Sequence, residues 1–269
     1  MFNLYIFKCL IYIIMSDLRD FKINTPQYYF YKDMHKHQTL EFVVQMKGKY
    51  SVLNNKKMTI KQALALMDTF IDPSDPDVDT HNSIHAYQTA ERIRKKYPEN
   101  KELQIIGLIH DLGKVLFEFG EPNWAIVGDT YVVGCQFPES IVYYDTLKDN
   151  VDYGKFDKLG IYDYGCGLDK LNITFGHDEY LYQVLKQNSN HSISERYMNI
   201  IRFHSFYPWH TGSDYYHFMN ENDRTILKDV LLFNDFDLYS KEDTEIVTPE
   251  MKEYYGQILD EYFNGELNW

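Results

Sequence analysis

The sequence predicts an all-α protein, a single-domain helical bundle with minor short strands. Apolar residues recur at intervals of three and four along several segments, as they do on the buried face of a helix. No repeat, low-complexity tract or Gly/Ser-rich linker divides the 269 residues, and 44% of them are hydrophobic. One domain with a sizeable core therefore accounts for the chain. The segments 127–133 and 140–145 are short and β-branched or aromatic, which favours small strands.

The predicted helices have recognisable start and stop signals. Thr59 is an expected N-cap, and Asn82 or Ser83 can cap a helix that ends before Pro98. Residues 72–79 hold two prolines and four aspartates, and they predict a loop. Helices are predicted at residues 39–47, 59–70, 85–96, 102–119, 177–187, 194–203, 225–233 and 249–263.

Charge and cysteine usage exclude several classes of function. The net charge of −13 and the pI near 5.2 argue against a nucleic-acid or anionic-membrane surface. Cys9, Cys135 and Cys166 lie far apart, so neither a disulfide framework nor a thiolate zinc site is indicated. A cytoplasmic protein is the expectation, with no membrane and no nucleic-acid partner.

The N-terminal segment is predicted to lie outside the folded domain. Residues 1–15 form an apolar run that is too short for a spanning helix and is interrupted by Lys8. No small-residue cleavage site follows it, as a signal peptide would require. We therefore assign residues 1–14 to an extension of unclear role and residues 15–269 to a single folded domain.

The helix predicted at residues 102–119 carries polar side chains at positions where its apolar periodicity predicts buried hydrophobic residues. His110 and Asp111 are both potential metal ligands, so the pair indicates a metal site. Lys114 follows Asp111 by three residues and His110 by four, which on a helix brings its ammonium to the same side. Nearby metal ions would repel the charged form of Lys114 and so favour its neutral amine. Lys114 is therefore a candidate proton shuttle or hydrogen-bond donor to a metal-bound substrate. A solvated lysine, or an ion pair with Asp111, is the alternative.

Further candidate ligands lie elsewhere in the chain. His177 and His204 fall on apolar faces of their predicted helices, where a single histidine is more often a hydrogen-bonded core residue. Together with His85 and His110 they make four, and four histidines with two aspartates suit iron or manganese better than zinc alone. By pattern alone, Asp237 is equally a surface cap at the end of an apolar helix.

Nine segments of the chain resemble the myo-inositol oxygenase family, non-haem di-iron enzymes built on a divergent HD-domain helical fold. The resemblance covers most of the chain from about Arg19 onward. The matching segments are residues 34–39, 75–79, 85–91, 110–115, 120–125, 127–130, 176–180, 201–212 and 236–239.

The resemblance implies a set of site residues. One iron would be held by His85, His110, Asp111 and Asp237, and Asp111 would bridge to a second iron on His177 and His204. Asp111 and Lys114 would be catalytic. The implied substrate contacts are Arg19, Asp72, Ser74, Lys114, Gly128, Asp129, His204 and Ser205. His81 is an additional imidazole at a position where this sequence departs from the family pattern. We expect it to be exposed or to contact the metal ligands without binding the metal itself.

The resemblance also implies an activity. A mixed-valent Fe(II)/Fe(III) pair would use O2 as co-substrate to cleave the C1–C6 bond of myo-inositol, giving D-glucuronate in a four-electron oxidation that belongs to inositol catabolism. The enzyme is expected to be a monomer.

Two alternatives have a basis in the residues. His85, His110-Asp111 and Asp237 also have the spacing of an HD-type metal-dependent phosphohydrolase. Binding of a phosphate substrate would require more cationic side chains than Lys114 and Arg19, and the acidic segment 72–79 would repel such a substrate. A catalytically silent binding module would be favoured by a missing ligand, but all six are present.

Overall fold

The computed structural model describes residues 22–72, 74, 82–240 and 246–269, and over these residues the predicted all-α class is confirmed. The α-helices are α2 (Pro26–His37), α3 (Leu40–Lys49), α4 (Ile60–Leu66), α5 (Asn82–Lys96), α6 (Lys101–Ile109), α7 (His177–Gln187), α8 (Glu195–Phe203), α9 (Tyr207–His210), α10 (Glu221–Ser240) and α11 (Pro249–Tyr262). The 3₁₀ helices are η1 (Met67–Thr69), η2 (Leu112–Phe119), η3 (Asn123–Ala125), η4 (Tyr144–Asp149), η5 (Leu168–Lys170) and η6 (Tyr216–Phe218).

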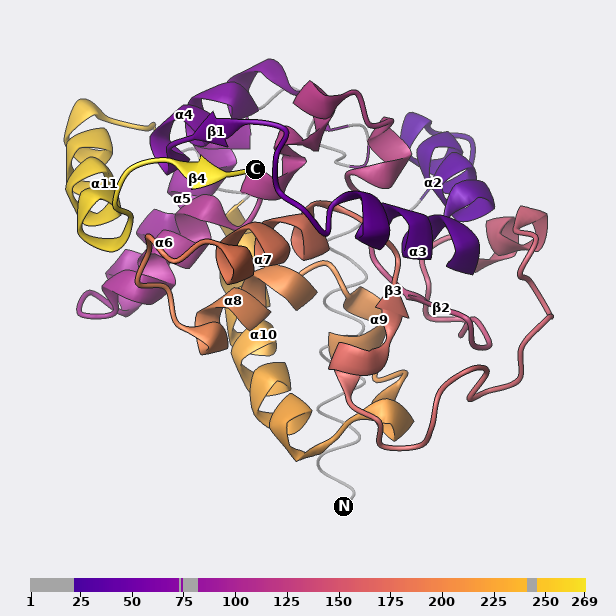
Figure 1. Cartoon of the computed structure of the whole chain (residues 1–269). Coiled ribbons are helices and arrows are strands. Elements are labelled where there is room, and N and C mark those ends of the chain that lie inside the picture. The colour runs from indigo at the N-terminus through magenta and orange to yellow at the C-terminus, as the bar shows by residue number, and fades with distance from the viewer. Residues whose placement is uncertain (1–21, 73, 75–81, 241–245) are drawn as a thin grey trace.

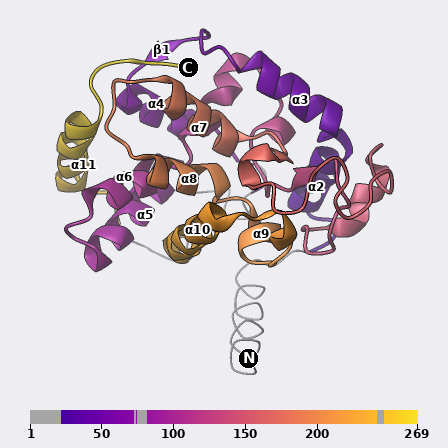
Figure 2. The ribbon, with the colours of Figure 1, turned by 60° about the horizontal axis from the view of Figure 1, so that its bottom comes forward.

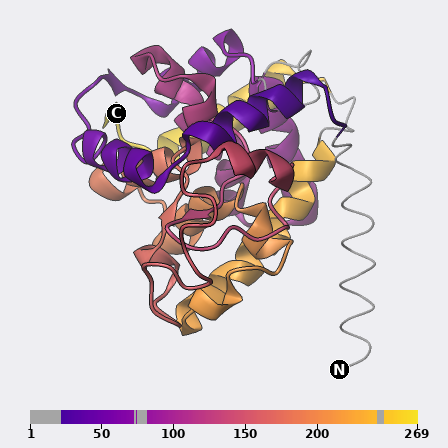
Figure 3. The ribbon, with the colours of Figure 1, turned by 90° about the vertical axis from the view of Figure 1, so that its right-hand side faces the viewer.

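Two small antiparallel sheets accompany the helices. Strand β1 (Lys57–Met58) pairs with β4 (Leu267–Asn268), and β2 (Val132–Val133) pairs with β3 (Asn172–Ile173). Figure 3 shows the C-terminal end of the chain beside the segment that carries β1. Among the described residues, no helix is long and apolar enough to cross a membrane.

The helices α7 and α8 lie at the centre of the molecule. Figure 1 shows them between α5 and α6 on one side and α2 and α3 on the other. Helix α10 runs beneath them and contacts both α5 and α8, as Figure 2 shows from below. The ends of α6, α7 and α8 are thereby gathered in one region.

Side-chain capping explains where several helices begin. Thr59 accepts a hydrogen bond from the amide of Gln62, whose own side chain bonds back to the amide of Thr59. This capping box confirms the predicted start of α4. Helix α5 adjoins residues outside the described ranges, so the predicted cap at Asn82 stays a prediction. Ser83 lies inside α5, and Asn82, its first described residue, donates its side-chain amide to the carbonyl of Phe70 at 2.7 Å.

The single helix predicted at residues 102–119 is wrong, because the chain forms two segments there. Helix α6 ends at Ile109 and the 3₁₀ helix η2 begins at Leu112. At the start of η2 the amide of Lys114 donates to the carbonyl of Asp111, the i+3 pattern of the tighter helix. Apolar periodicity cannot distinguish the two forms, since both bury a face that repeats about every three to four residues.

Other segments also differ from the prediction. Only residues 132–133 of the segment 127–133 form a strand. The segment 140–145 forms none, because the chain turns at Tyr143 (φ 50°) into η4. Helix α10 extends well beyond the predicted 225–233, so Asp237 lies within the helix and not at its end. Residues 1–21, and therefore the predicted extension at 1–14, fall outside the described residues.

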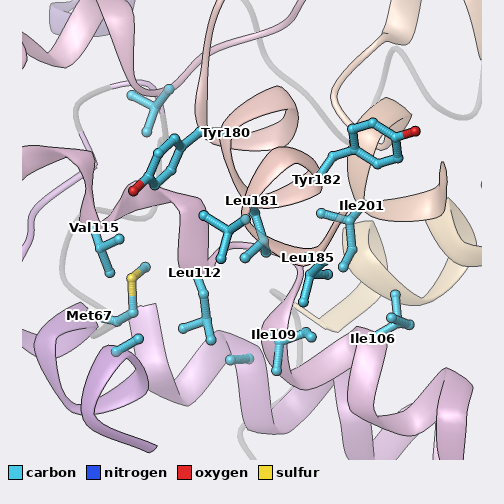
Figure 4. Packing of buried hydrophobic residues seen from close by; sticks show 14 of the residues in the cluster. Met67, Ile106, Ile109, Leu112, Val115, Tyr180, Leu181, Tyr182, Leu185 and Ile201 are labelled. Atoms are coloured by element: carbon cyan, nitrogen blue, oxygen red, sulfur yellow. The ribbon is translucent and has the colours of Figure 1, made fainter. Parts of the chain in front are cut away.

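The main hydrophobic core lies between the α6–η2 segment and α7. Figure 4 shows Ile109 and Leu112 on one side facing Leu181 and Leu185 on the other, all fully buried. A second cluster surrounds β2, β3 and the short helix α9. This packing holds the junction between α6 and η2 against the start of α7, where the candidate site lies.

Candidate metal centre

Three of the six predicted ligands lie at helix ends. His110 is the first residue after α6, His204 is the first after α8, and His177 begins α7. Their side chains are almost completely buried. The predicted ligands thus project from helix termini into the space where these helices meet.

All three histidines are oriented in the same way. Each ring places Nδ1 against a backbone carbonyl, so Nδ1 carries the hydrogen and Nε2 keeps its lone pair. For His110 and His204 the acceptor lies three residues earlier, in the last helical turn, where carbonyls lack partners within the helix. The acceptors are Gly107 for His110 at 2.9 Å, Ile201 for His204 at 2.7 Å and Ile126 for His177 at 2.8 Å.

The lone pairs of His177 and His204 face one another. Their Nε2 atoms are 3.2 Å apart, although both atoms are acceptors in this tautomer. Asp111 Oδ1 lies 3.2 Å from Nε2 of His177 and 3.7 Å from Nε2 of His204. Buried acceptors that converge without a hydrogen between them are costly unless a cation lies among them. The donor set therefore fits a metal ion.

A second group of donors lies on the other side of Asp111. Its Oδ2 is 3.5 Å from Nε2 of His110, and that nitrogen is 3.3 Å from Asp237 Oδ1. Asp237 Oδ1 is also 2.9 Å from Nε2 of His85. The two oxygens of Asp111 thus face two different groups of imidazoles, the arrangement expected of a carboxylate that bridges two ions. The structure brings together all six residues that the resemblance implies as ligands.

The buried carboxylates among the candidate ligands stay ionised, so they need positive charge beside them. Although burial alone would raise the pKa of Asp111, Lys114 and His110 hold it well below its ordinary value. Asp237 likewise keeps a depressed pKa despite burial, because His110 and His85 contact it. Burial lowers the pKa of His177, but Asp178 and Asp111 outweigh this and raise it to about 10. Divalent cations would supply the same positive charge without protons.

Lys114 is buried between two carboxylates. Its Nζ lies 2.8 Å from Asp72 Oδ2 and 2.9 Å from Asp111 Oδ2. Burial lowers the pKa of Lys114, but these two carboxylates outweigh burial and raise it above its ordinary value. These two carboxylates favour the charged, ammonium form of Lys114. Lys114 is an ion-pair partner of Asp111, as the alternative interpretation held, and it is a hydrogen-bond donor.

Asp72 and Ser74 extend the hydrogen-bond network around Lys114. Asp72 Oδ1 accepts hydrogen bonds from the amide of Ser74 at 2.9 Å and from its hydroxyl at 2.6 Å. Asp72 Oδ2 faces Lys114, so the three predicted substrate contacts form one continuous network. Such a network offers both donors and acceptors to a polar ligand.

The remaining predicted substrate contacts lie on another segment. Ser205 follows His204, and its carbonyl accepts from the amide of Thr130 at 2.9 Å. That bond brings Gly128 and Asp129 to the end of α8. Asp129 Oδ1 accepts from the hydroxyl of Tyr31 at 2.9 Å.

Gly128 has a φ of 102°, and an added Cβ would lie 2.7 Å from the sulfur of Met34. Only glycine therefore fits at this position. Arg19 and His81 lie outside the described residues.

One buried carboxylate was missed by sequence reasoning. Asp178 Oδ1 lies 2.9 Å from Nε2 of His177, and Asp178 also accepts from the amide and the hydroxyl of Ser205, each at 3.2 Å. Asp178 is 2% exposed. The signal in the sequence was its position next to His177 at the start of a helix.

Comparisons with known proteins decide the family. The family model described as myo-inositol oxygenase matches residues 26–269. The chain belongs to the myo-inositol oxygenase family. Inositol oxygenase from Danio rerio is 46% identical over 259 residues, which are 94% of this chain and 91% of that protein. The Homo sapiens protein is 46% identical over 89% of this chain and 85% of its own length, and inositol oxygenase 1 from Arabidopsis thaliana is 46% identical over 89% and 79%.

Membership of the myo-inositol oxygenase family confirms the enzyme class expected from the sequence. The matched residues include every described member of the candidate centre. The donor set and the family therefore point to the same kind of site.

Proposed function

We propose that this protein is a di-iron oxygenase that uses O2 to cleave the C1–C6 bond of myo-inositol, giving D-glucuronate. The observation that carries the proposal is the bridging placement of Asp111, which presents Oδ1 to His177 and His204 and Oδ2 to His110. His85 and Asp237 would complete the ligands of a first ion beside His110. Four imidazoles and two carboxylates suit a pair of iron ions, mixed-valent Fe(II)/Fe(III), better than zinc alone.

Bound iron would supply the activation of O2 and the chelation of substrate hydroxyls, which no side chain here can supply. The overall reaction balances as one myo-inositol and one O2 giving one glucuronic acid and one water, so no external reductant is consumed. The two ions would differ in their protein ligands, because the first would have four and the second three. The second ion would therefore have room for substrate.

The side chains around the centre provide recognition and proton control. Lys114 holds an ammonium next to Asp111, where it can donate to a substrate oxygen that replaces the carboxylate of Asp72 or lies beside it. Asp72, Ser74, Asp129 and Ser205 offer donors and acceptors that match a neutral, hydroxylated ring. A substrate that lacks one hydroxyl would leave one of these groups unpaired.

The proposal is tested with metal analysis and an O2-uptake assay on a panel of small polyols. The iron-loaded protein should consume about one O2 per myo-inositol, in keeping with the balanced reaction, and form glucuronate. The surface variant Lys148→Ala, which has a 59% exposed side chain, serves as the control and should behave as the parent. Release of phosphate from nucleotides without O2 uptake would instead support the phosphohydrolase.

A further inference from the structure

Asp178 holds a position that neither the sequence pattern nor the family assignment explains. It is the second residue of α7, directly after His177, and its carboxylate is fully buried at the metal centre. Its Oδ1 lies 2.9 Å from Nε2 of His177, closer than Asp111 Oδ1 is to the same nitrogen at 3.2 Å. An acidic side chain buried this deeply requires partners that stabilise its charge.

The spacing of the donor atoms is that of neighbouring ligands on one ion. Ligands about 2.1 Å from an octahedral metal lie about 3 Å from their neighbours. Around Nε2 of His177, the distances are 2.9 Å to Asp178 Oδ1, 3.2 Å to Asp111 Oδ1 and 3.2 Å to His204 Nε2. His177, Asp178 and His204 can each offer one donor atom within 4.8 Å of the others. Asp178 thus fits the same coordination sphere as the three implied ligands.

The second ion has the smaller set of implied ligands. The first ion would be held by His85, His110, Asp237 and Asp111, and the second by Asp111, His177 and His204. A carboxylate oxygen is an acceptable ligand for iron at such a vacant coordination position. Asp178 is the remaining carboxylate in the described centre that touches a histidine of the second group.

Asp178 is also joined to a predicted substrate contact. Its Oδ2 accepts from the amide of Ser205 and its Oδ1 from the hydroxyl, each at 3.2 Å. If Oδ1 binds the ion, the amide bond to Oδ2 can persist and hold the carboxylate in place. The hydroxyl of Ser205 is then free to reorient toward a substrate.

We propose that Asp178 is a ligand of the second metal ion when substrate is absent, and that a hydroxyl of the substrate takes its place. This inference rests on the two-ion centre of the proposed function. Asp178 would keep the second ion bound between turnovers, when the substrate does not complete its ligands. Once displaced, its carboxylate would remain anchored by the amide of Ser205.

The first test is a titration of the apo protein with Co²⁺ in the absence and presence of myo-inositol. Asp178→Asn should bind the first equivalent as the parent does and the second about 10- to 100-fold more weakly, the range for losing a supporting ligand interaction. Saturating myo-inositol should narrow this difference, because the substrate supplies the missing oxygens. Equal affinity of variant and parent for the second equivalent overturns the inference.

Two further variants separate the roles of the carboxylate. Ser205→Ala keeps the carboxylate but loses the hydroxyl, so it should retain both equivalents while its KM for myo-inositol rises. Asp260→Asn makes the same chemical change at a surface side chain that is 71% exposed, and it should titrate as the parent does. If Ser205→Ala loses the second equivalent as Asp178→Asn does, Asp178 acts only through the serine and the inference fails.

A measurement on the unmutated protein is independent of any folding defect. A crystal structure of the Co²⁺-loaded protein without myo-inositol should place Asp178 Oδ1 about 2.1 Å from the second ion, a bonding distance. A separation beyond about 3 Å, well outside the bonding range of a divalent transition-metal ion, overturns the inference. If the unmutated protein binds no second ion at all, it is the proposed function that fails.

Discussion

The backbone of Gly113 lies directly against the carbonyl of His177. A Cβ added at Gly113 would come 2.0 Å from that oxygen and 2.7 Å from the carbonyl carbon. The contact joins η2 to the first turn of α7, so it sets how closely Asp111 approaches His177. A glycine two residues after the His110-Asp111 pair is therefore a requirement of the candidate metal centre, and its reason is steric and not conformational.

Gly113→Ala should destabilise the fold and weaken metal binding together. The clashing atoms belong to the backbone and cannot move aside, so we expect a loss of at least about 3 kcal/mol, the upper range for overpacking. Gly48→Ala in α3 is the matched control, because an added Cβ there meets nothing within 4 Å. It should stabilise the protein by about 0.5–1 kcal/mol. Urea unfolding measures both changes, and a Gly113→Ala protein as stable as its parent would contradict the close contact.

Lys114→Ala should reduce turnover far more than metal content. Lys114 donates to the carboxylate of Asp111 from outside the imidazole groups, so its loss leaves every implied metal ligand in place. We expect kcat to fall about 10²- to 10⁴-fold, the range for losing a group that controls a proton. Metal analysis of the same sample should still find two ions per chain. Normal turnover would remove Lys114 from the mechanism.

His35 should make the protein acid-sensitive. Its ring is completely buried, its Nδ1 bonds to Thr146 at 2.6 Å, and burial lowers its pKa to about 3. The unfolded chain takes up this proton near pH 6.5 and the folded protein does so only near pH 3. The stability is therefore fully present above pH 6.5 and is lost progressively as the pH falls toward 3.

At pH 5 the unfolded chain has bound a proton at His35 and the folded protein has not, so the free energy of unfolding should be about 2 kcal/mol lower than at neutral pH. His35→Gln removes the titrating group, so the difference in unfolding free energy between variant and parent should shrink by that amount between pH 7.5 and pH 5. Urea unfolding at both pH values measures it. A difference that does not change with pH would show that His35 is accessible to protons in the folded state.

Trp269 should anchor the C-terminal end of the chain. Its side chain is fully buried, and its indole Nε1 donates to the carbonyl of Met58 at 3.0 Å. Trp269→Ala leaves a large cavity and an unpaired carbonyl, so we expect a loss of about 3–5 kcal/mol. Asn268→Ala changes the neighbouring exposed side chain and should cost much less. Similar unfolding free energies for the two variants would contradict this anchoring role.

Apolar periodicity and capping residues determined much of the helical framework. The prediction of α7 at residues 177–187 is confirmed in full, and Thr59 caps α4 as expected. These features are local, because a cap involves residues three apart and a buried face repeats along one helix. The six implied ligands also came from the sequence, through residue type and the resemblance to a family.

The tertiary structure alone decided how those residues meet. The close approach of Gly113 to His177 accompanies the change from α6 to η2, which a pattern over residues 102–119 cannot show. Asp72 and Asp111 raise the pKa of Lys114 because they lie on either side of it, although Asp72 is distant in sequence. Asp178 became a candidate ligand only through its short distance to His177 Nε2. A sequence reports which side of its own helix a residue faces, while charge and metal affinity depend on distances between helices that packing sets.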